Sequence, residues 1–96
     1  MELYAVWRRR NRDWAAGRPL EEQAQWGEHA AFMMAGAADG FVVLAGPIDE
    51  MGALIIVRAE SREAVAAWLA EDPWTISGLL ATERIARWQL RIGSLP

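Results

Sequence analysis

Three short apolar segments constrain the fold of this chain more than any other feature. They cover residues 3–7, 41–45 and 53–57. Each has the length of a β-strand and is rich in aromatic or β-branched residues, which strands favour. Each is also apolar on both faces, as in the first segment, where Leu3 and Ala5 alternate with Tyr4 and Val6. A sheet that is apolar on both faces must be covered on both, so helices on one face and a second subunit on the other are expected.

Residues 19–38 are predicted to form the first helix. Pro19 suits the first turn of a helix, and Glu21 and Glu22 suit the positive end of the helix dipole. Gly40 is expected to end this helix, because glycine is favoured just past a helix C-terminus.

Residues 61–71 are predicted to form the second helix. Ser61 is a good N-cap, and apolar residues then recur at helical spacing. Asp72 precedes Pro73, and a residue before proline is pushed out of helical geometry, so the helix should end there.

The remaining segments complete the order of elements. Gly46 and Pro47 are predicted to turn the chain after the second strand. Residues 84–92 alternate between apolar and polar side chains, as in a strand with one polar face. The order β-α-β-β-α-β predicts an α+β, ferredoxin-like split fold: a four-stranded antiparallel sheet with two helices on one face. With 96 residues, one domain spanning 1–96 is expected.

Composition excludes several classes of protein. The net charge of −3 disfavours a general nucleic-acid-binding role, and no apolar run approaches the length that crosses a bilayer. The absence of cysteine excludes thiolate catalysis and a Cys-based metal site, and a single histidine excludes a His-rich zinc site within one subunit. We therefore expect no metal, cofactor, nucleic-acid partner or membrane contact. The first basic residues follow an apolar run, the reverse of a signal peptide, which indicates a cytoplasmic protein.

His29, the only histidine, is the first candidate for chemistry. It lies beside a helical stripe that includes Trp26, Met33 and Ala37. Histidine is the one side-chain type whose unperturbed charge change falls near neutral pH, so at the edge of a pocket it could act as a general base. A lone histidine in a helix is also often structural, and the residues alone leave both interpretations open.

Other candidate residues each carry a local alternative. Asp72 could orient His29, as a carboxylate does in a catalytic triad, or could simply belong to an Asp-Pro turn. Gly46 could let the backbone approach a ligand closely or could only form a tight turn. The arginines of residues 8–10 could bind an anion or could be a solvated strand end. Trp74 is more often core than a substrate platform.

Several segments in the same order resemble the YCII-related (YciI-like) family. They are Arg-Pro-Leu-Glu-Glu-Gln at 18–23, Trp-Gly-Glu-His-Ala-Ala-Phe-Met at 26–33, Gly-Phe-Val-Val-Leu-Ala-Gly-Pro at 40–47, Ala-Glu-Asp-Pro-Trp at 70–74, Gly-Leu-Leu at 78–80, and Trp88. The resemblance covers essentially the whole chain. One departure is Ala45, where similar sequences often have glycine.

The resemblance implies a homodimeric ferredoxin-like α+β barrel with an active site centred on His29 and Asp72. A related domain dehydrochlorinates a chlorinated hydroxyquinol by proton abstraction and elimination. The leading hypothesis is therefore a small cofactor-independent lyase or isomerase acting on small cyclic molecules. The rest of the substrate-binding site is predicted to comprise Trp26, Gly46, Pro47 and Trp74. The alternative hypothesis is a non-catalytic module that binds a small ligand or mediates dimerisation.

Overall fold

The computed structural model describes residues 1–95. Its strands are β1 (Glu2–Arg10), β2 (Val42–Ile48), β3 (Gly52–Ala59) and β4 (Leu80–Trp88). Its helices are the 3-10 turn η1 (Leu20–Glu22), α1 (Trp26–Ala38), α2 (Arg62–Leu69) and the short α3 (Pro73–Ile76). Apart from the two short helical turns, this is the predicted order of elements.

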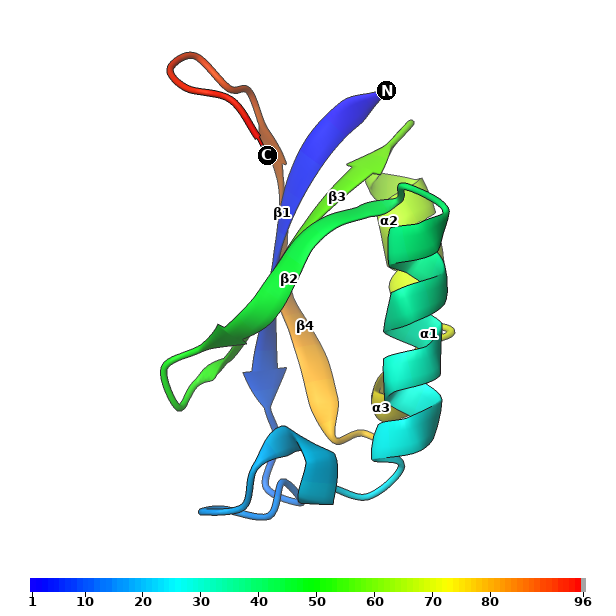
Figure 1. Cartoon of the computed structure of the whole chain (residues 1–96), viewed down its shortest axis with the longest axis vertical. Coiled ribbons are helices and arrows are strands. Elements are labelled where there is room, and N and C mark those ends of the chain that lie inside the picture. Colours follow the sequence, from blue (N-terminus) through cyan, green and yellow to red (C-terminus); the bar gives the residue numbers. More distant parts are fainter. Residues whose placement is uncertain (96) are drawn as a thin grey trace.

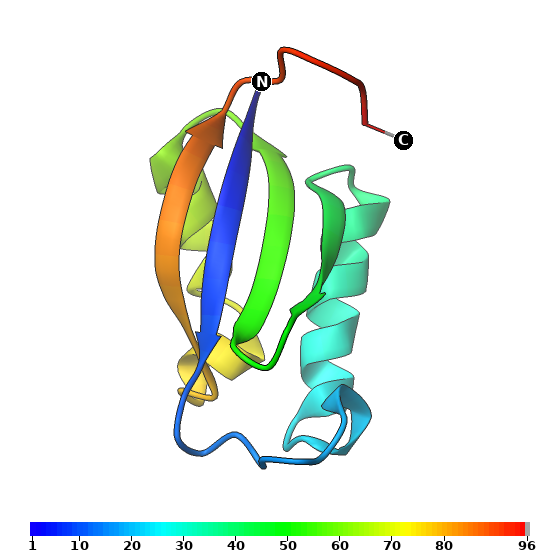
Figure 2. The ribbon, with the colours of Figure 1, turned by 90° about the vertical axis from the view of Figure 1, so that its left-hand side faces the viewer.

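The four strands form one antiparallel sheet in the order β2-β3-β1-β4. The helices α1, α2 and α3 lie on one face of this sheet (Figure 1), which confirms the predicted α+β, ferredoxin-like architecture. Figure 2 shows the other face, which no helix of residues 1–95 covers. Within the same residues, no helix is long and apolar enough to cross a membrane.

The main core lies between the sheet and the helices. Tyr4 pairs with Val57 across β1 and β3, and Val6 pairs with Ile55, so that alternate residues of the two central strands face the same side. These side chains pack with Val65 of α2 in one cluster, and Val6, Val57 and Val65 have no exposed surface. The alternation of side chains along the strands therefore determines which apolar residues face the helices.

The first helix begins later than predicted. Residues 19–38 do not form one helix: η1 ends at Glu22, and Gln25 has a left-handed backbone with φ of 61° before α1 starts. Buried Gln23 explains the interruption, since its side chain exchanges hydrogen bonds with both backbone groups of Ala15 and also donates to the carbonyl of Arg18. This glutamine anchors the loop after β1, and its hydrogen bonds outweigh the local helix propensity of residues 19–25.

Gly36 is the buried residue of α1 and sets how closely this helix approaches its neighbours. A Cβ atom at Gly36 would lie 2.9 Å from Val42 and 3.0 Å from Trp68. Glycine therefore lets the C-terminal half of α1 pack against β2 and α2. Ala37, predicted to share the buried stripe with Trp26, is exposed.

Two predicted boundaries are wrong. Gly46 and Pro47 do not turn the chain but extend β2. Proline, which has no backbone N–H, is tolerated there because β2 is an edge strand with only one neighbouring strand. The last strand spans Leu80–Trp88 rather than 84–92, because it begins directly after the turn at Gly78 and pairs with β1 along its whole length. The predicted second helix, 61–71, is slightly shorter as α2.

Candidate functional site

Asp72 lies where α2 gives way to α3. Its side chain caps α3 by accepting a hydrogen bond from the backbone N–H of Trp74 at 3.0 Å, and Pro73 occupies the first helical position. The Asp-Pro turn expected from the sequence is therefore present. The carboxylate is nevertheless completely buried, so Asp72 is not simply a capping residue at the surface.

Arg8 of β1 compensates this buried charge. Its Nη1 donates to Asp72 Oδ2 at 3.2 Å, and its Nη2 donates to Thr75 Oγ1 at 2.7 Å. The side chains of Arg8 and Asp72 both have no exposed surface. A buried pair of this kind is tolerated because each charge is matched and hydrogen-bonded.

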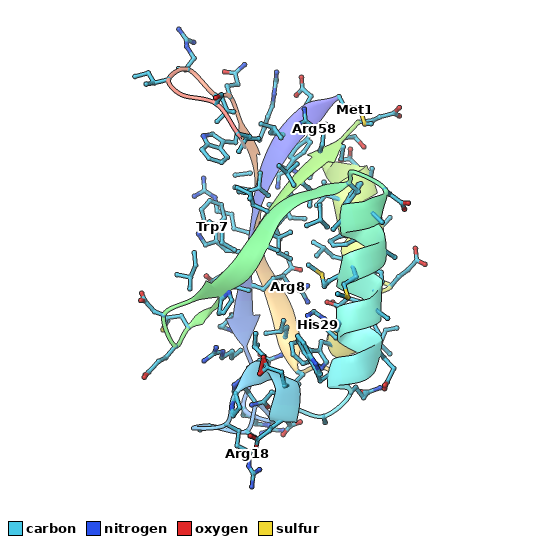
Figure 3. All side chains as sticks on the ribbon, viewed as in Figure 1. Met1, Trp7, Arg8, Arg18, His29 and Arg58 are labelled. Carbon is cyan, nitrogen blue, oxygen red and sulfur yellow. The ribbon has the colours of Figure 1, made fainter. Side chains whose placement is uncertain are left out.

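His29 of α1 contacts the other carboxylate oxygen. Its Nδ1 lies 2.8 Å from Asp72 Oδ1, and its side chain is 11% exposed. The imidazole ring also stacks on the indole of Trp74, with centroids 3.8 Å apart and planes 8° from parallel. Trp74 is fixed in turn, because its indole N–H donates to the carbonyl of Ala24 at 2.7 Å. Figure 3 places Arg8 and His29 on the helix side of the sheet and Trp7 on the other side.

The electrostatics of the site keep Asp72 ionised. Burial alone would raise its pKa, but the hydrogen bonds from His29 and the Trp74 backbone, together with the charges of His29 and Arg8, hold the pKa below its ordinary value. An ionised carboxylate only accepts hydrogen bonds, so Nδ1 of His29 must be the protonated nitrogen. The second nitrogen, Nε2, is then left as an acceptor when the imidazole is neutral.

Arg8 keeps its positive charge in this environment. Burial lowers its pKa, while the charge of Asp72 and the hydrogen bond to it act in the opposite direction. An arginine pKa lies so far above neutrality that the guanidinium stays protonated.

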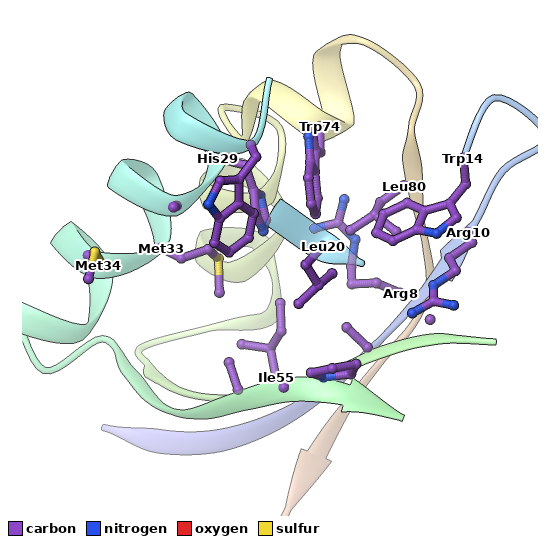
Figure 4. A pocket seen from close by; sticks show the side chains of 17 residues that line it. Arg8, Arg10, Trp14, Leu20, His29, Met33, Met34, Ile55, Trp74 and Leu80 are labelled. Carbon is purple, nitrogen blue, oxygen red and sulfur yellow. The ribbon is translucent and has the colours of Figure 1, made fainter. Parts of the chain in front are cut away.

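A pocket of about 280 Å³ opens beside this constellation (Figure 4). His29, Trp26 and Trp74 line it from the helix side, and Gly46 and Pro47 line it from β2. All the predicted substrate-binding residues and His29 therefore surround one cavity. Asp72 is not among the lining residues and contacts the ring of His29 from outside the pocket.

Arg8, Arg10 and Trp14 also line the pocket, although none was among the predicted catalytic or substrate-binding residues. The first strand was expected to cover residues 3–7, whereas β1 continues to Arg10. Alternation along the longer strand puts Arg8 on the same side as Tyr4 and Val6. Extending that alternation by one step would have identified Arg8 from the sequence.

The polar groups of this site do not form a metal cluster. Across the part of the chain that the structure describes, 1–95, no group of three or more histidine or carboxylate side chains is arranged to hold a metal ion. The arrangement instead offers one acceptor nitrogen, on a histidine fixed by a carboxylate, at the wall of an apolar cavity. Such a group can take a proton from a bound molecule.

Comparisons with known proteins agree with this fold. A solved structure of 5-chloro-2-hydroxyhydroquinone dehydrochlorinase from Burkholderia phenoliruptrix AC1100, in complex with 2,5-dihydroxybenzoquinone, superimposes with a TM-score of 0.57. The two proteins share 22% sequence identity, and the match covers 95% of each chain. At this identity the likeness shows a shared fold and no more. Among curated proteins, none matches the sequence. The model of the YCII-related domain matches residues 3–89, nearly the whole chain, and the protein therefore belongs to the YCII-related family.

Proposed function

We propose that this protein is a small enzyme in which His29 takes a proton from a small cyclic organic molecule bound in the pocket. The observation that carries the proposal is the 2.8 Å contact between His29 Nδ1 and the ionised carboxylate of Asp72, with the ring of His29 on the pocket wall. A general base needs a free acceptor atom within reach of its substrate, and Nε2 is the only ring nitrogen left for that role.

Asp72 and Arg8 act through His29 rather than on the substrate. Asp72 holds the tautomer of His29 in which Nε2 accepts, and its negative charge stabilises the imidazolium that forms after proton transfer. Arg8 keeps Asp72 ionised and fixed, and Trp74 restricts the orientation of the imidazole by stacking. Each of these groups is buried or held by hydrogen bonds before a ligand arrives, which favours catalysis because little reorganisation remains.

The proposed reaction is an elimination or an isomerisation. His29 takes a proton from a saturated ring carbon next to a carbonyl group, as in the keto tautomer of a hydroxylated ring, and the electron pair of that C–H bond forms a new C=C bond. In an elimination the pair displaces a leaving group such as chloride, which departs with its own electron pair. In an isomerisation the imidazolium returns the proton to another atom of the conjugated system. Neither route, so written, needs a redox cofactor.

The similar solved structure supports this class of reaction. Its name describes a dehydrochlorinase, an elimination enzyme, and it was determined with a six-membered quinone ring bound. A pocket of about 280 Å³ is large enough for a ring of that size. The rival function, a non-catalytic binding or dimerisation module, predicts ligand binding without proton transfer.

Hydrogen–deuterium exchange separates these two functions. The protein is incubated in D₂O with 5-chloro-2-hydroxyhydroquinone, and ring-proton exchange and chloride release are followed by NMR and by a chloride electrode. We expect both to be accelerated by the wild type and lost in His29→Asn. The exposed neighbour Glu28→Gln is the matched control on the same helix. Binding without acceleration of exchange would favour the binding module, and full activity in His29→Asn would show that His29 is not the base.

We further propose that two copies associate through the sheet face opposite the helices (Figure 2). Strand pairing places Trp7 opposite Leu54, Leu3 opposite Trp88, and Leu44 opposite Ile56, so much of this face is apolar, although it also carries Arg58 and Arg84. Trp88 and Leu44 are 42% and 43% exposed in the single chain. A second copy would remove this apolar surface from water.

A further inference from the structure

The pocket that surrounds His29 has a positive end. Its walls are apolar except for three side chains, namely His29, Arg8 and Arg10. None of its lining residues, all of which belong to the described part of the chain, is acidic. A ligand in this cavity therefore meets a base and two guanidinium groups but no negative charge.

The two arginines differ in whether a carboxylate already matches their charge; Arg8 also has one buried donor, Nε, without a hydrogen-bond partner. The charge of Arg8 is paired with Asp72, and a second N–H donor of its guanidinium bonds to Thr75. Arg10 donates from Nη1 to the backbone carbonyl of Glu50 at 3.2 Å, which uses a donor but supplies no charge. Within residues 1–95, the carboxylates that pair with arginine contact Arg8, Arg9, Arg18 and Arg87, and Arg10 is not among these. The positive charge of Arg10 is uncompensated within this part of the chain.

Arg10 is also held in place before a ligand binds. Its guanidinium lies over the ring of Trp14, 4.6 Å from the centroid, and its backbone N–H donates to the carbonyl of Met51. Trp14 packs edge-on against Trp74 with centroids 5.2 Å apart, and Trp74 stacks on His29. Figure 4 shows His29 and Arg10 at opposite sides of the cavity, with Trp74 and Leu20 between them.

From these contacts we infer that the pocket takes its ligand as an anion, a ring bearing an ionised oxygen, and that Arg10 is the residue that binds this oxygen. A guanidinium has five N–H donors in a planar fork that suits oxyanions, and Arg10 commits one of them to Glu50. The apolar walls accept the ring, and the two polar ends fix its direction.

The inference rests on the proposed function and names its substrate class. When His29 removes a ring proton, negative charge develops on the substrate. In a conjugated ring this charge spreads to an oxygen across the ring, where Arg10 would stabilise it. Arg10 would then bind the ground state and stabilise the charge that develops during proton transfer.

Binding can be tested without any turnover, so the result is separate from that of the proton-exchange experiment. Isothermal titration calorimetry would use 2,5-dihydroxybenzoquinone as a ring-oxygen anion, benzoate as a carboxylate, and benzamide as the neutral analogue of benzoate. The variants are Arg10→Met and Arg9→Met. Arg9 is the matched control, because it is the neighbouring residue of the same strand, pairs with exposed Glu83 at 3.7 Å and does not line the pocket.

We expect wild-type protein and Arg9→Met to bind an anion more tightly than benzamide. Arg10→Met should weaken anion binding by about 10- to 100-fold, the loss typical of a hydrogen bond to a charged group, and leave benzamide unchanged. Arg10→Lys should restore part of the affinity. Comparing the affinities of the two anions shows whether the pocket prefers a ring oxygen or a carboxylate. The inference is overturned if neither anion binds the wild type, if benzamide binds as well as the anions, or if Arg9→Met and Arg10→Met behave alike.

Discussion

The guanidinium of Arg8 and the carboxylate of Asp72 form an ion pair at 3.2 Å in which neither side chain touches solvent. The two residues come from the first strand and from the cap of the last helix, 64 positions apart. The pair joins the sheet to the helical layer directly beside His29. Stability and the candidate site therefore depend on the same two charges.

Removing Arg8 should destabilise the fold strongly. Arg8→Met keeps much of the side-chain volume but leaves the buried Asp72 without its cation, and losing one partner of a buried pair costs about 3–5 kcal/mol. Urea unfolding followed by tryptophan fluorescence measures the change. Arg9→Met, which breaks only an exposed pair with Glu83, should change stability by less than about 1 kcal/mol. Equal effects of the two substitutions would show that the buried pair is not special.

Asp72 should make the protein sensitive to acid. Its pKa in the folded chain lies below the ordinary value of 3.8, so folding favours the ionised form. The resulting stability is fully present above the unfolded-state pKa and is lost as pH falls through the folded-state pKa. The free energy of unfolding of the wild type should therefore decline below about pH 4 more steeply than that of Asp72→Asn, which has no carboxyl to protonate. Parallel pH profiles would contradict this assignment.

Sequence patterns predicted the layers of the fold, and the family resemblance paired His29 with Asp72, but no pattern fixed the distance between these two residues or revealed Arg8 as their neighbour. The apolar alternation of Tyr4 and Val6 and the Asp-Pro turn at Asp72 are local signals, and each led to the right element. The contact between His29 and Asp72 joins residues 43 positions apart, and no spacing rule fixes such a distance. It arises only when α1 and α3 pack on the same face of the sheet.

Arg8 shows most clearly why part of the site was missed. The sequence Arg8-Arg9-Arg10 looks uniform, and a run of like charges usually marks solvated chain. Continued strand geometry separates the three: Arg8 is buried against Asp72, Arg9 is exposed, and Arg10 reaches the pocket beside Trp14. Residue type gave no hint of these different environments, because the difference depends on where β1 ends.

Gly52 should tolerate no side chain. A Cβ atom there would lie 1.7 Å from the carbonyl oxygen of Arg8, so β1 and β3 would have to move apart beside the site. Gly52→Ala should destabilise by about 1–3 kcal/mol or more, as expected for overpacking against backbone. Gly46→Ala is the control within the sheet, since a Cβ atom at Gly46 would meet nothing within 4 Å. Thermal unfolding of both variants measures the difference, and similar melting temperatures would argue against this close approach.

Association through the open sheet face should be visible in solution. Sedimentation equilibrium at micromolar concentration should give about twice the chain mass. A standard interface between two subunits buries on the order of 1,600 Å². Trp88→Glu places a charge on the apolar face and should yield a monomer. Ile92→Glu, at a residue that is 94% exposed and outside the sheet, should remain dimeric. A wild-type monomer would exclude this assembly.

Replacing Asp72 by asparagine should impair catalysis more than shape. The amide of Asp72→Asn can donate to Nδ1 of His29, which would move the ring proton to Nε2 and remove the acceptor that the proposed base needs. We expect a fall of about 10²- to 10⁴-fold in the rate of proton exchange, with near-wild-type binding of 2,5-dihydroxybenzoquinone. Asp39→Asn, at the exposed end of α1, should leave the rate unchanged. Because stability also depends on Asp72, rates are compared at a temperature where circular dichroism shows both variants folded. A folded Asp72→Asn variant with the wild-type exchange rate would mean that His29 does not depend on Asp72 for its tautomer.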